Sequence, residues 1–245
     1  MSIQTPRSPD MSAPALQVAA LSARYGKKEI LHDISLHVGS GEIVAVLGHN
    51  GAGKTTLLRS IMGMHPERSG EIHRLGKDIS RRPYYRNVAE GMAFTPADAP
   101  VFRPLSVEAN LRLGAYSTAP SDLEERLEGV YATFPKLKDR RQQAAGTLSG
   151  GEQRILAVSM AVMNRPRLML LDEPSIGLAP ATANMIMAEI SAISEKLGTA
   201  VLIVDQNVRS ALRISSRVYY LRMGRIILEE PAGVSAIREH FWDLF

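Results

Sequence analysis

The clearest feature of the chain is a set of short, continuous apolar runs, each followed at once by polar residues. They are Ile43–Leu47, Leu168–Leu171 and Ala200–Val204. Apolar runs of this length, bounded by polar signals, predict strands that are buried on both faces. Apolar residues at helical spacing lie between the runs. This alternation predicts an α/β core with a mainly parallel sheet.

The two ends of the chain follow another pattern. Leu16–Tyr25 and Ile30–Val38 are predicted to be strands of an antiparallel edge sheet. Val218–Leu221 and Arg225–Glu229 flank Met223–Gly224 and are predicted to form a hairpin.

The middle of the chain, about Val107–Asn164, is mainly helical in pattern. It predicts a helical subdomain, at about 98–164, inserted in a single domain that covers 16–245. Residues 1–15 are rich in Ser and Pro and have no apolar segment of the kind found in secretory signals. We expect them to form a flexible N-terminal tail.

Composition narrows the class of protein. Apolar residues make up 45% and charged residues 22% of the 245 residues, which is an ordinary globular balance. No apolar run approaches the ~20 residues that cross a bilayer. There is no cysteine, which excludes disulfides and thiolate metal sites. The net charge of +4 is spread along the chain. A solvated surface explains it, and attraction to an anionic membrane surface stays open.

A glycine-rich segment after the first apolar run matches the pattern G-x-x-x-x-G-K-[ST], and it predicts a P-loop NTPase core. Glycines let the backbone turn its N–H groups toward phosphate oxygens, and a following helix adds the positive end of its dipole. Lys54 would supply charge to the outer phosphates, and Thr55 a hydroxyl to Mg²⁺. The predicted ATP-binding residues here are Gly48, His49, Asn50, Gly51, Ala52, Gly53, Lys54, Thr55 and Thr56.

Asp172 and Glu173 follow the second apolar run. Carboxylates at the C-terminal end of a buried strand lie where open α/β sheets bind ligands. Asp172 is a candidate to hold Mg²⁺ together with Thr55, and Glu173 to orient or deprotonate the attacking water. Taken alone, the pair could simply begin a helix before Pro174, but the phosphate loop favours the catalytic interpretation.

The segment Leu148–Gln153, of sequence LSGGEQ, resembles the signature motif of ATP-binding-cassette proteins. In that family two cassettes meet head to tail, and each ATP lies between the phosphate loop of one and the signature of the other. The resemblance implies that Ser149, Gly150, Gly151 and Glu152 bind the nucleotide of a second subunit. A Ser before a helix is also an ordinary N-cap, which is compatible with that role.

The resemblance extends over about Leu16–Glu229 and is greatest to the ATPase subunits of branched-chain amino-acid importers. It implies that Tyr25 stacks on adenine and that ATP and Mg²⁺ are the cofactors. It also implies that the chain is a cytoplasmic ATPase, peripheral on the inner face of the cell membrane. Its implied partners are two transmembrane permease subunits, a second ATPase subunit and, indirectly, an extracytoplasmic solute-binding protein. No nucleic-acid partner is implied.

Two positions depart from the general pattern of the family. Where a Gln usually follows the strand near Ala93–Thr95, this chain has Pro96, Ala97 and Asp98. The family's switch His aligns with Gln206, which resembles the branched-chain importers and is a candidate catalytic residue. Gln can donate a hydrogen bond but cannot carry a proton's charge. The two departures favour a heterodimer with a second, different cassette, and a homodimer stays open.

Two other functions remain as alternatives. A nucleic-acid or ribosome-associated cassette protein would agree with the basic sequence pI of about 9.4, but no concentrated basic arm is present. A P-loop kinase would not need the LSGGE segment. The transported substrate is not fixed by this sequence.

Overall fold

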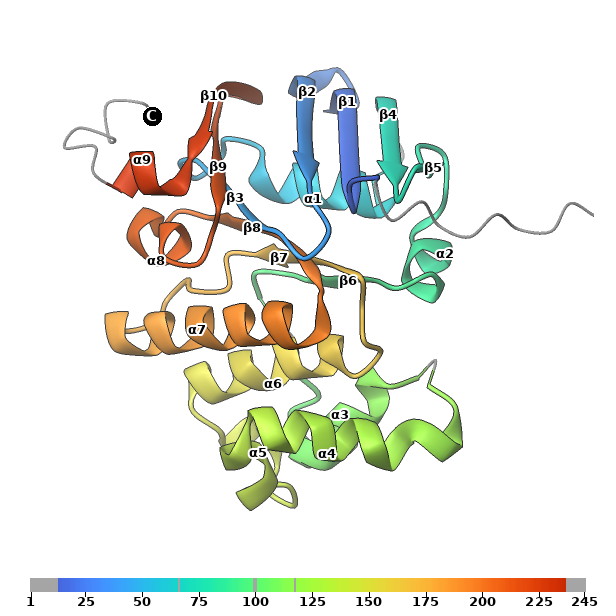
Figure 1. The fold of residues 1–245 in the computed structure, drawn as a ribbon, viewed down its shortest axis with the longest axis vertical. Coiled ribbons are helices and arrows are strands. Elements are labelled where there is room, and N and C mark those ends of the chain that lie inside the picture. Colours follow the sequence, from blue (N-terminus) through green and yellow to red (C-terminus); the bar gives the residue numbers. More distant parts are fainter. Residues whose placement is uncertain (1–12, 66, 99–100, 117, 237–245) are drawn as a thin grey trace, which may run out of the picture.

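The computed structural model describes residues 13–65, 67–98, 101–116 and 118–236, and the larger of its two sheets forms the centre of the fold (Figure 1). The strand order is β10-β9-β3-β8-β7-β6, and all neighbours are parallel except the β9–β10 hairpin. The mainly parallel core and the hairpin are therefore confirmed. The strands are β3 (Ile43–Leu47), β6 (Met92–Thr95), β7 (Leu168–Asp172), β8 (Ala200–Asp205), β9 (Arg217–Arg222) and β10 (Arg225–Pro231).

A smaller antiparallel sheet lies above the core sheet in Figure 1. Its order is β2-β1-β4-β5. The first two of its strands were predicted from the sequence, whereas the last two have no strong apolar alternation. The strands are β1 (Leu16–Tyr25), β2 (Lys28–Val38), β4 (Arg68–Arg74) and β5 (Lys77–Asp78).

Helix α1 (Lys54–Met62) lies between the two sheets (Figure 1). Alternate residues of the core strands face it: Leu168 and Leu170 of β7 join the same buried cluster as Leu57 and Leu58 of α1. The residues between them, Met169 and Leu171, face the opposite layer, formed by α6 (Gly150–Val162) and α7 (Pro180–Leu197). Both faces of the strands are buried, which is why their sequences are continuously apolar.

The predicted helical segment forms α3 (Val107–Gly114), α4 (Leu123–Thr133), α5 (Pro135–Asp139) and α6. In Figure 1 these helices lie below α7, on the far side of the core sheet from the antiparallel sheet. Their apolar faces, including Leu111, Leu127 and Leu156, share the second buried cluster. The remaining short elements are α2 (Tyr84–Ala89), α8 (Val208–Leu212), α9 (Ala232–Ala236) and two 3₁₀ turns, Pro120–Asp122 and Ala145–Thr147.

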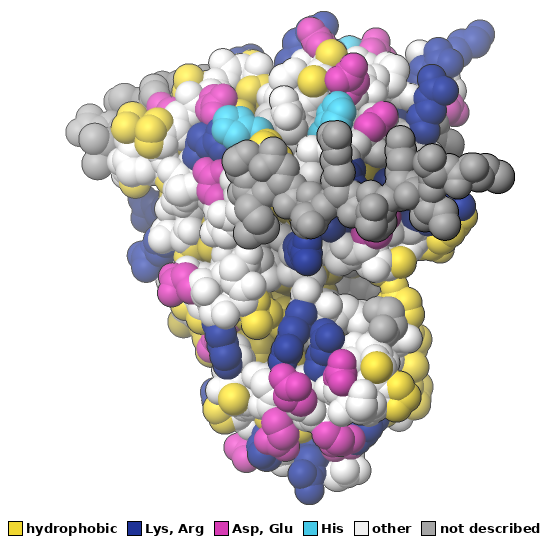
Figure 2. Space-filling model, turned by 45° about the vertical axis from the view of Figure 1, so that its right-hand side comes forward, with side chains coloured by type: hydrophobic (Ala, Val, Ile, Leu, Met, Phe, Trp, Pro, Cys, Tyr) yellow, Lys and Arg dark blue, Asp and Glu magenta, His cyan; other side chains and the backbone are white. Residues whose placement is uncertain are grey.

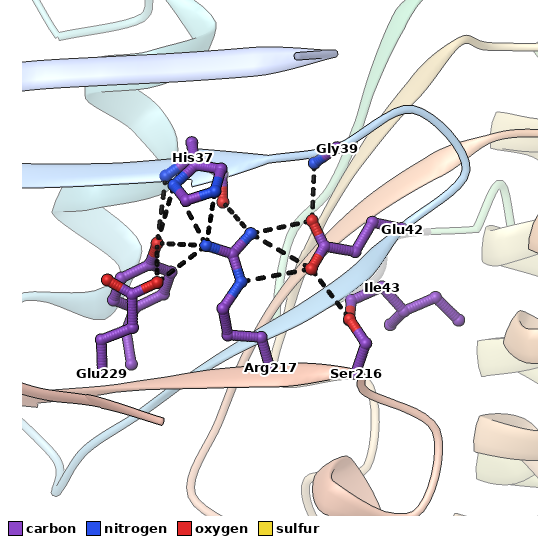
Figure 3. Close-up of polar contacts among 8 residues, drawn as sticks. His37, Gly39, Glu42, Ile43, Ser216, Arg217 and Glu229 are labelled. Carbon is purple, nitrogen blue, oxygen red and sulfur yellow. Dashed lines mark hydrogen bonds and ion pairs between the residues drawn. The ribbon is translucent and has the colours of Figure 1, made fainter. Parts of the chain in front are cut away.

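A group of polar side chains around Arg217, here called the Arg217 cluster, joins the two sheets (Figure 3). Arg217 of β9 donates to Glu42 at 2.8 and 3.1 Å and to Glu229 of β10 at 2.8 Å. It also donates to the carbonyl of His37 on β2, at 3.1 Å. Tyr219 completes the cluster, and burial raises the pKa of its hydroxyl to about 12. The cluster lies at the edge where β3 and β9 begin, opposite the edge that carries the phosphate loop.

Within the described part of the chain, no helix is long and apolar enough to cross a membrane. Residues 1–12 of the predicted tail lie outside the described residues. Ala15, also assigned to the tail, is 3% exposed and packs in the core, so the packed domain begins slightly earlier than expected.

Candidate functional site

The phosphate-type loop lies between the end of β3 and the first residue of α1, as the sequence pattern requires. Gly51 and Gly53 have φ angles of +81° and +109°, which other residues rarely adopt. At Gly48 a Cβ atom would lie 2.5 Å from the carbonyl oxygen of Leu221. The three glycines are therefore needed for the local backbone. His49, Asn50 and Gly51 are exposed, whereas Ala52, Gly53 and Thr56 are buried.

Lys54 occupies the centre of the site with a side chain that is 5% exposed. Its Nζ donates to the carbonyl oxygens of Gly48 at 2.8 Å and His49 at 3.0 Å. The same nitrogen lies 3.0 Å from Oε1 of Glu173. The loop thus wraps its own lysine, and the lysine links it to the acidic end of β7.

The strand order explains this meeting of distant residues. Because β8 separates β3 from β7, the C-terminal ends of these parallel strands lie at one edge of the sheet. Asp172 ends β7 and Asp205 ends β8, where Asp205 pairs with Leu47. Glu173 follows with a φ angle of +45°, and its N–H donates to the carbonyl of Val204 at 2.8 Å. This left-handed backbone is strained for a non-glycine residue and points to a positional requirement.

The environment of Asp172 suits the role of a metal ligand. It is 2% exposed, and neither carboxylate oxygen has a hydrogen bond of normal geometry. Burial raises the pKa of its carboxyl, and Thr55 and Lys54 nearby partly offset that rise. Among the described residues no group of three or more His, Cys, Asp or Glu side chains could hold a metal ion. An unpaired carboxylate beside a hydroxyl suits Mg²⁺, which keeps waters and takes phosphate oxygens as its other ligands.

Asp205 is a buried member of the site that the sequence did not single out. Its carboxylate accepts from the N–H of Asn207 at 2.8 Å and from the hydroxyl of Ser175 at 2.9 Å. Burial raises the pKa of Asp205, and these hydrogen bonds oppose the rise. The contact ties the loop after β7 to the loop after β8, which carries the partly exposed Gln206. Its place directly after the third apolar run, Ala200–Val204, is the sequence signal that could have identified Asp205.

The signature segment begins α6 and presents an exposed end. Ser149 is the N-cap, and it forms a capping box with Glu152: its N–H and hydroxyl donate to Oε2 of Glu152 at 3.0 and 2.8 Å. Glu152 also pairs with Arg140 at 2.9 Å. Gly151 is buried against Thr182 of α7, where a Cβ would lie 2.5 Å from a methyl carbon. Ser149 and Gly150 are exposed, so the capping interpretation is confirmed while the helix end stays accessible.

The turn after β6, where the resembling family usually has Gln, contains Ala97, and a side chain of α6 binds the backbone of this turn. Arg154 of α6 donates a hydrogen bond to the carbonyl oxygen of Ala97. Burial lowers the pKa of Arg154, while the surrounding carboxylates of Asp98, Asp205, Asp172 and Glu173 oppose that change. The guanidinium therefore adds positive charge near the acidic strand ends. Sequence reasoning missed Arg154, because only the fold brings α6 against this turn.

Tyr25, the predicted adenine contact, lies at the end of β1 and is 50% exposed. One face of its ring stacks on His65, with ring centroids 4.4 Å apart and planes inclined by 29°. His65 was not a predicted site residue.

Comparisons with known proteins agree with this geometry. The family described as ABC transporter matches residues 31–176. A high-affinity branched-chain amino acid transport ATP-binding protein, BraG of Pseudomonas aeruginosa, is 42% identical over 87% of this chain and 91% of its own length. A probable branched-chain amino acid transport ATP-binding protein, LivF of Archaeoglobus fulgidus, is 35% identical over 92% and 96%. The lipopolysaccharide export ATP-binding protein LptB of Escherichia coli is also 35% identical, over 84% and 86%.

Solved structures show the same fold. The ABC transporter subunit cbiO1 of Clostridium perfringens aligns with a TM-score of 0.83 and 25% identity, over 94% of each chain. The ADP conformation of MJ1267, an ATP-binding cassette, also has a TM-score of 0.83, with 24% identity over 95% of this chain and 98% of the other. The family model and the relatives at 35–42% identity identify a nucleotide-binding ATPase. The chain belongs to the ABC transporter ATPase family.

Proposed function

We propose that this chain hydrolyses Mg-ATP to power an importer of branched-chain amino acids or related amino acids and amides. The observation that carries the proposal is the meeting of Lys54, Asp172 and Glu173 at one edge of the sheet, with Lys54 Nζ 3.0 Å from Glu173. These residues supply a phosphate-binding cation, a metal ligand and a base at a single site. The similarity to BraG and LivF supports the substrate class.

Each residue has a defined part in this proposal. The N–H groups of Gly48–Thr56 and the N-terminus of α1 bind the β- and γ-phosphates, and Lys54 adds its charge. Thr55 and Asp172 hold Mg²⁺, which neutralises developing charge on the phosphates. Glu173 orients and accepts the proton of the attacking water, and Gln206 donates a hydrogen bond to the γ-phosphate. Tyr25 stacks on adenine.

Binding ATP requires the Lys54 side chain to change its partner. Lys54 must exchange Glu173 for phosphate oxygens, because its ammonium group has few donors left after its bonds to Gly48 and His49. The exchange releases Glu173 to contact water. Phosphate binding and activation of the base are thus coupled through one ion pair.

The exposed end of α6 supports a second cassette as partner. Ser149 and Gly150 face solvent, and the carboxylate of Glu152 is directed back to the N-cap, so backbone N–H groups remain at an accessible helix end. An exposed helix N-terminus favours an anion. In the proposed assembly that anion is the γ-phosphate bound to the other subunit.

An apolar groove of about 360 Å³ supports a membrane-embedded partner. It lies between α2, β6, α3 and α6, and its rim carries Tyr84, Leu113 and Tyr116, which are 51%, 45% and 68% exposed. Figure 2 shows hydrophobic side chains exposed along the edge of the molecule and in the hollow above the helical subdomain. Clustered exposed aromatics mark interaction surfaces. We propose that a helix of a permease subunit occupies the groove, with this chain on the cytoplasmic face.

Export of a lipopolysaccharide is the second candidate, and the 35% identity to LptB favours it specifically. Both candidates need the same ATPase site but different permeases. The test is co-expression of this chain with each permease pair, followed by purification from membranes. We expect a stable complex with amino-acid permeases whose ATPase activity rises when loaded solute-binding protein is added. A complex formed only with lipopolysaccharide-export permeases would contradict the proposal.

A further inference from the structure

The stacked pair of Tyr25 and His65 lies at one end of the nucleotide site. Tyr25 pairs with Lys28 across the β1–β2 turn, and three residues further along β2 lies Leu31. A Cβ on Gly53 of the phosphate loop would lie 2.9 Å from the side chain of Leu31. Because a bulge in β2 lets Leu31 pair with Ala23, only two residues from Tyr25 on β1, Tyr25 is about 7 Å along the strand from the residue that contacts the loop. That span suits a base whose phosphates are bound in the loop.

The two faces of the Tyr25 ring are in different environments. One face lies on the imidazole of His65, which is 4% exposed. Tyr25 as a residue is 50% exposed although His65 covers one face of its ring, from which we infer that the other face is open to a ligand. A base that stacks there would complete a three-ring stack with His65 at the bottom. Offset stacking of aromatic rings at such spacing is favourable.

The backbone around His65 is fixed to the Tyr25 turn. The N–H of Arg24 donates to the carbonyl of Glu67 at 3.0 Å, and the N–H of Gly26 donates to Oε2 of Glu67 at 3.2 Å. Arg68 donates to the carbonyl of His65 and to the carbonyl of Ser80. The residues on both sides of Tyr25 are thus held by the segment that carries His65.

Burial of the His65 side chain lowers the stability of the fold. Its Nε2 is buried without a hydrogen-bond partner. An unpaired buried nitrogen destabilises a fold, and an apolar side chain of similar size would avoid that cost. A histidine at this position therefore serves the stack with Tyr25 rather than the stability of the fold.

From these observations we propose that His65 is a positioning residue for the nucleobase, which holds the ring of Tyr25 in the orientation that adenine stacks on. The inference rests on the proposed ATP site, and it adds a second ring to that site. His65 acts through Tyr25 and does not touch the nucleotide. Its removal should affect ligands with a base and leave ligands that are phosphate alone unchanged.

The test is isothermal titration of the full chain with Mg-ADP and with Mg-tripolyphosphate, which has no base. We expect Tyr25→Ala to weaken ADP binding about 5- to 100-fold. We expect His65→Leu to weaken it about 3- to 10-fold, with tripolyphosphate binding unchanged in both variants. In the Tyr25→Ala background, His65→Leu should have no further effect. His65→Phe should bind ADP nearly as the parent chain does. His73→Leu, the same change on β4, is the matched control and should bind both ligands normally.

Thermal unfolding of the variants separates positioning from structural support. We expect His65→Leu to unfold at the parent temperature or above it, because the unpaired nitrogen is removed. A lower unfolding temperature together with equal weakening of ADP and tripolyphosphate would assign His65 a structural role and overturn the proposal. The proposal would also be overturned if His65→Leu bound ADP as the parent chain does while Tyr25→Ala bound it more weakly. Failure of the proposed ATP site is distinguishable, since the parent chain would then bind neither ligand, which would overturn both.

Discussion

The ammonium nitrogen of Lys54 lies 3.0 Å from Oε1 of Glu173, although 118 residues lie between them in the sequence. The two side chains are 5% and 10% exposed, so the pair is shielded from water. Lys54 begins α1 at the end of the phosphate loop, and Glu173 directly follows β7. This ion pair joins the two halves of the proposed site, and in the proposed mechanism its exchange for phosphate frees Glu173 to activate water.

Glu173→Gln should retain ATP binding and lose most hydrolysis. Gln keeps the shape of the side chain but cannot accept the proton of the attacking water, and loss of a general base costs about 10²–10⁴ in rate. Phosphate release measured under saturating Mg-ATP checks the rate, and equilibrium titration checks binding. Glu195→Gln, on the exposed face of α7, is the control and should hydrolyse ATP normally. Turnover by Glu173→Gln at the parental rate would show that another group activates water.

Lys54→Met should abolish ATP binding and also destabilise the nucleotide-free chain. Removing the ammonium group leaves Glu173 buried beside Asp172 without its cation, which costs about 3–5 kcal/mol in unfolding free energy. For a chain of this size the melting temperature should fall by about 6–20 °C. Differential scanning calorimetry measures the change.

The double variant Lys54→Met with Glu173→Gln provides the matched comparison for that loss of stability. Since the second change removes the unpaired charge, most of the lost melting temperature should return, while ATP binding stays absent. A double variant that melts as low as Lys54→Met would mean that the ion pair does not explain the stability.

Ser149→Arg should block turnover in the assembled dimer while the isolated chain still binds ATP at its own phosphate loop. The side chain is exposed at the end of α6, where arginine would occupy the place of the partner's γ-phosphate. Loss of the N-cap itself should cost about 1 kcal/mol. Ser106→Arg removes the equivalent cap of α3 and controls for that cost. If Ser149→Arg abolished ATP binding by the monomer, the shared-site arrangement would be wrong.

Arg217→Leu should destabilise the chain by about 2–4 kcal/mol at pH 7, because Glu42 and Glu229 lose their cation. Burial raises the pKa of Glu42, but hydrogen bonds from Arg217, the N–H of Gly39 and Ser216 outweigh burial, so the pKa lies below its usual 4.5. A lowered pKa in the folded state means that the contribution is present above pH 4.5 and is lost as pH falls through the folded pKa.

Unfolding of the parent chain and of Arg217→Leu should therefore be measured from pH 7 down to pH 3. We expect the gap in stability to be widest at pH 7 and to narrow below pH 4.5. The exposed Arg225→Leu should show little loss at any pH. A gap that stayed constant across the range would exclude Glu42 as its source.

The chain should work as one half of a heterodimer. Ala97 and Gln206 depart from the family pattern, and a homodimer would carry both departures at both sites. We expect the isolated Glu173→Gln chain to remain largely monomeric with Mg-ATP in light scattering, and co-expression with a second cassette that has a His at the position of Gln206 to raise ATPase activity. Gln206→His should change the rate at one site only. A stable homodimer that supports full transport would contradict this.

The sequence predicted the parts of the site that depend on local patterns. Gly48–Thr55 and Asp172 follow or end apolar runs that predict buried strands, and Ser149 precedes a helical pattern, so their places in the fold could be predicted from the sequence. Contacts between residues that lie far apart in the sequence could not be predicted in this way. The bond from Arg154 to Ala97 depends on how α6 packs against the turn after β6. The stack of His65 on Tyr25 depends on β4, whose sequence lacks a strand's alternation.

ATP-dependent uptake of radiolabelled leucine into proteoliposomes is the most direct test of the proposed function. The vesicles would contain this chain, a second cassette and two permease subunits, with solute-binding protein outside and Mg-ATP inside. The proposal predicts leucine accumulation that requires Mg-ATP and is lost with Glu173→Gln, while the Glu195→Gln complex transports normally. A properly assembled complex that hydrolyses ATP through Glu173 but accumulates no leucine, isoleucine, valine or related amino acid or amide would contradict it.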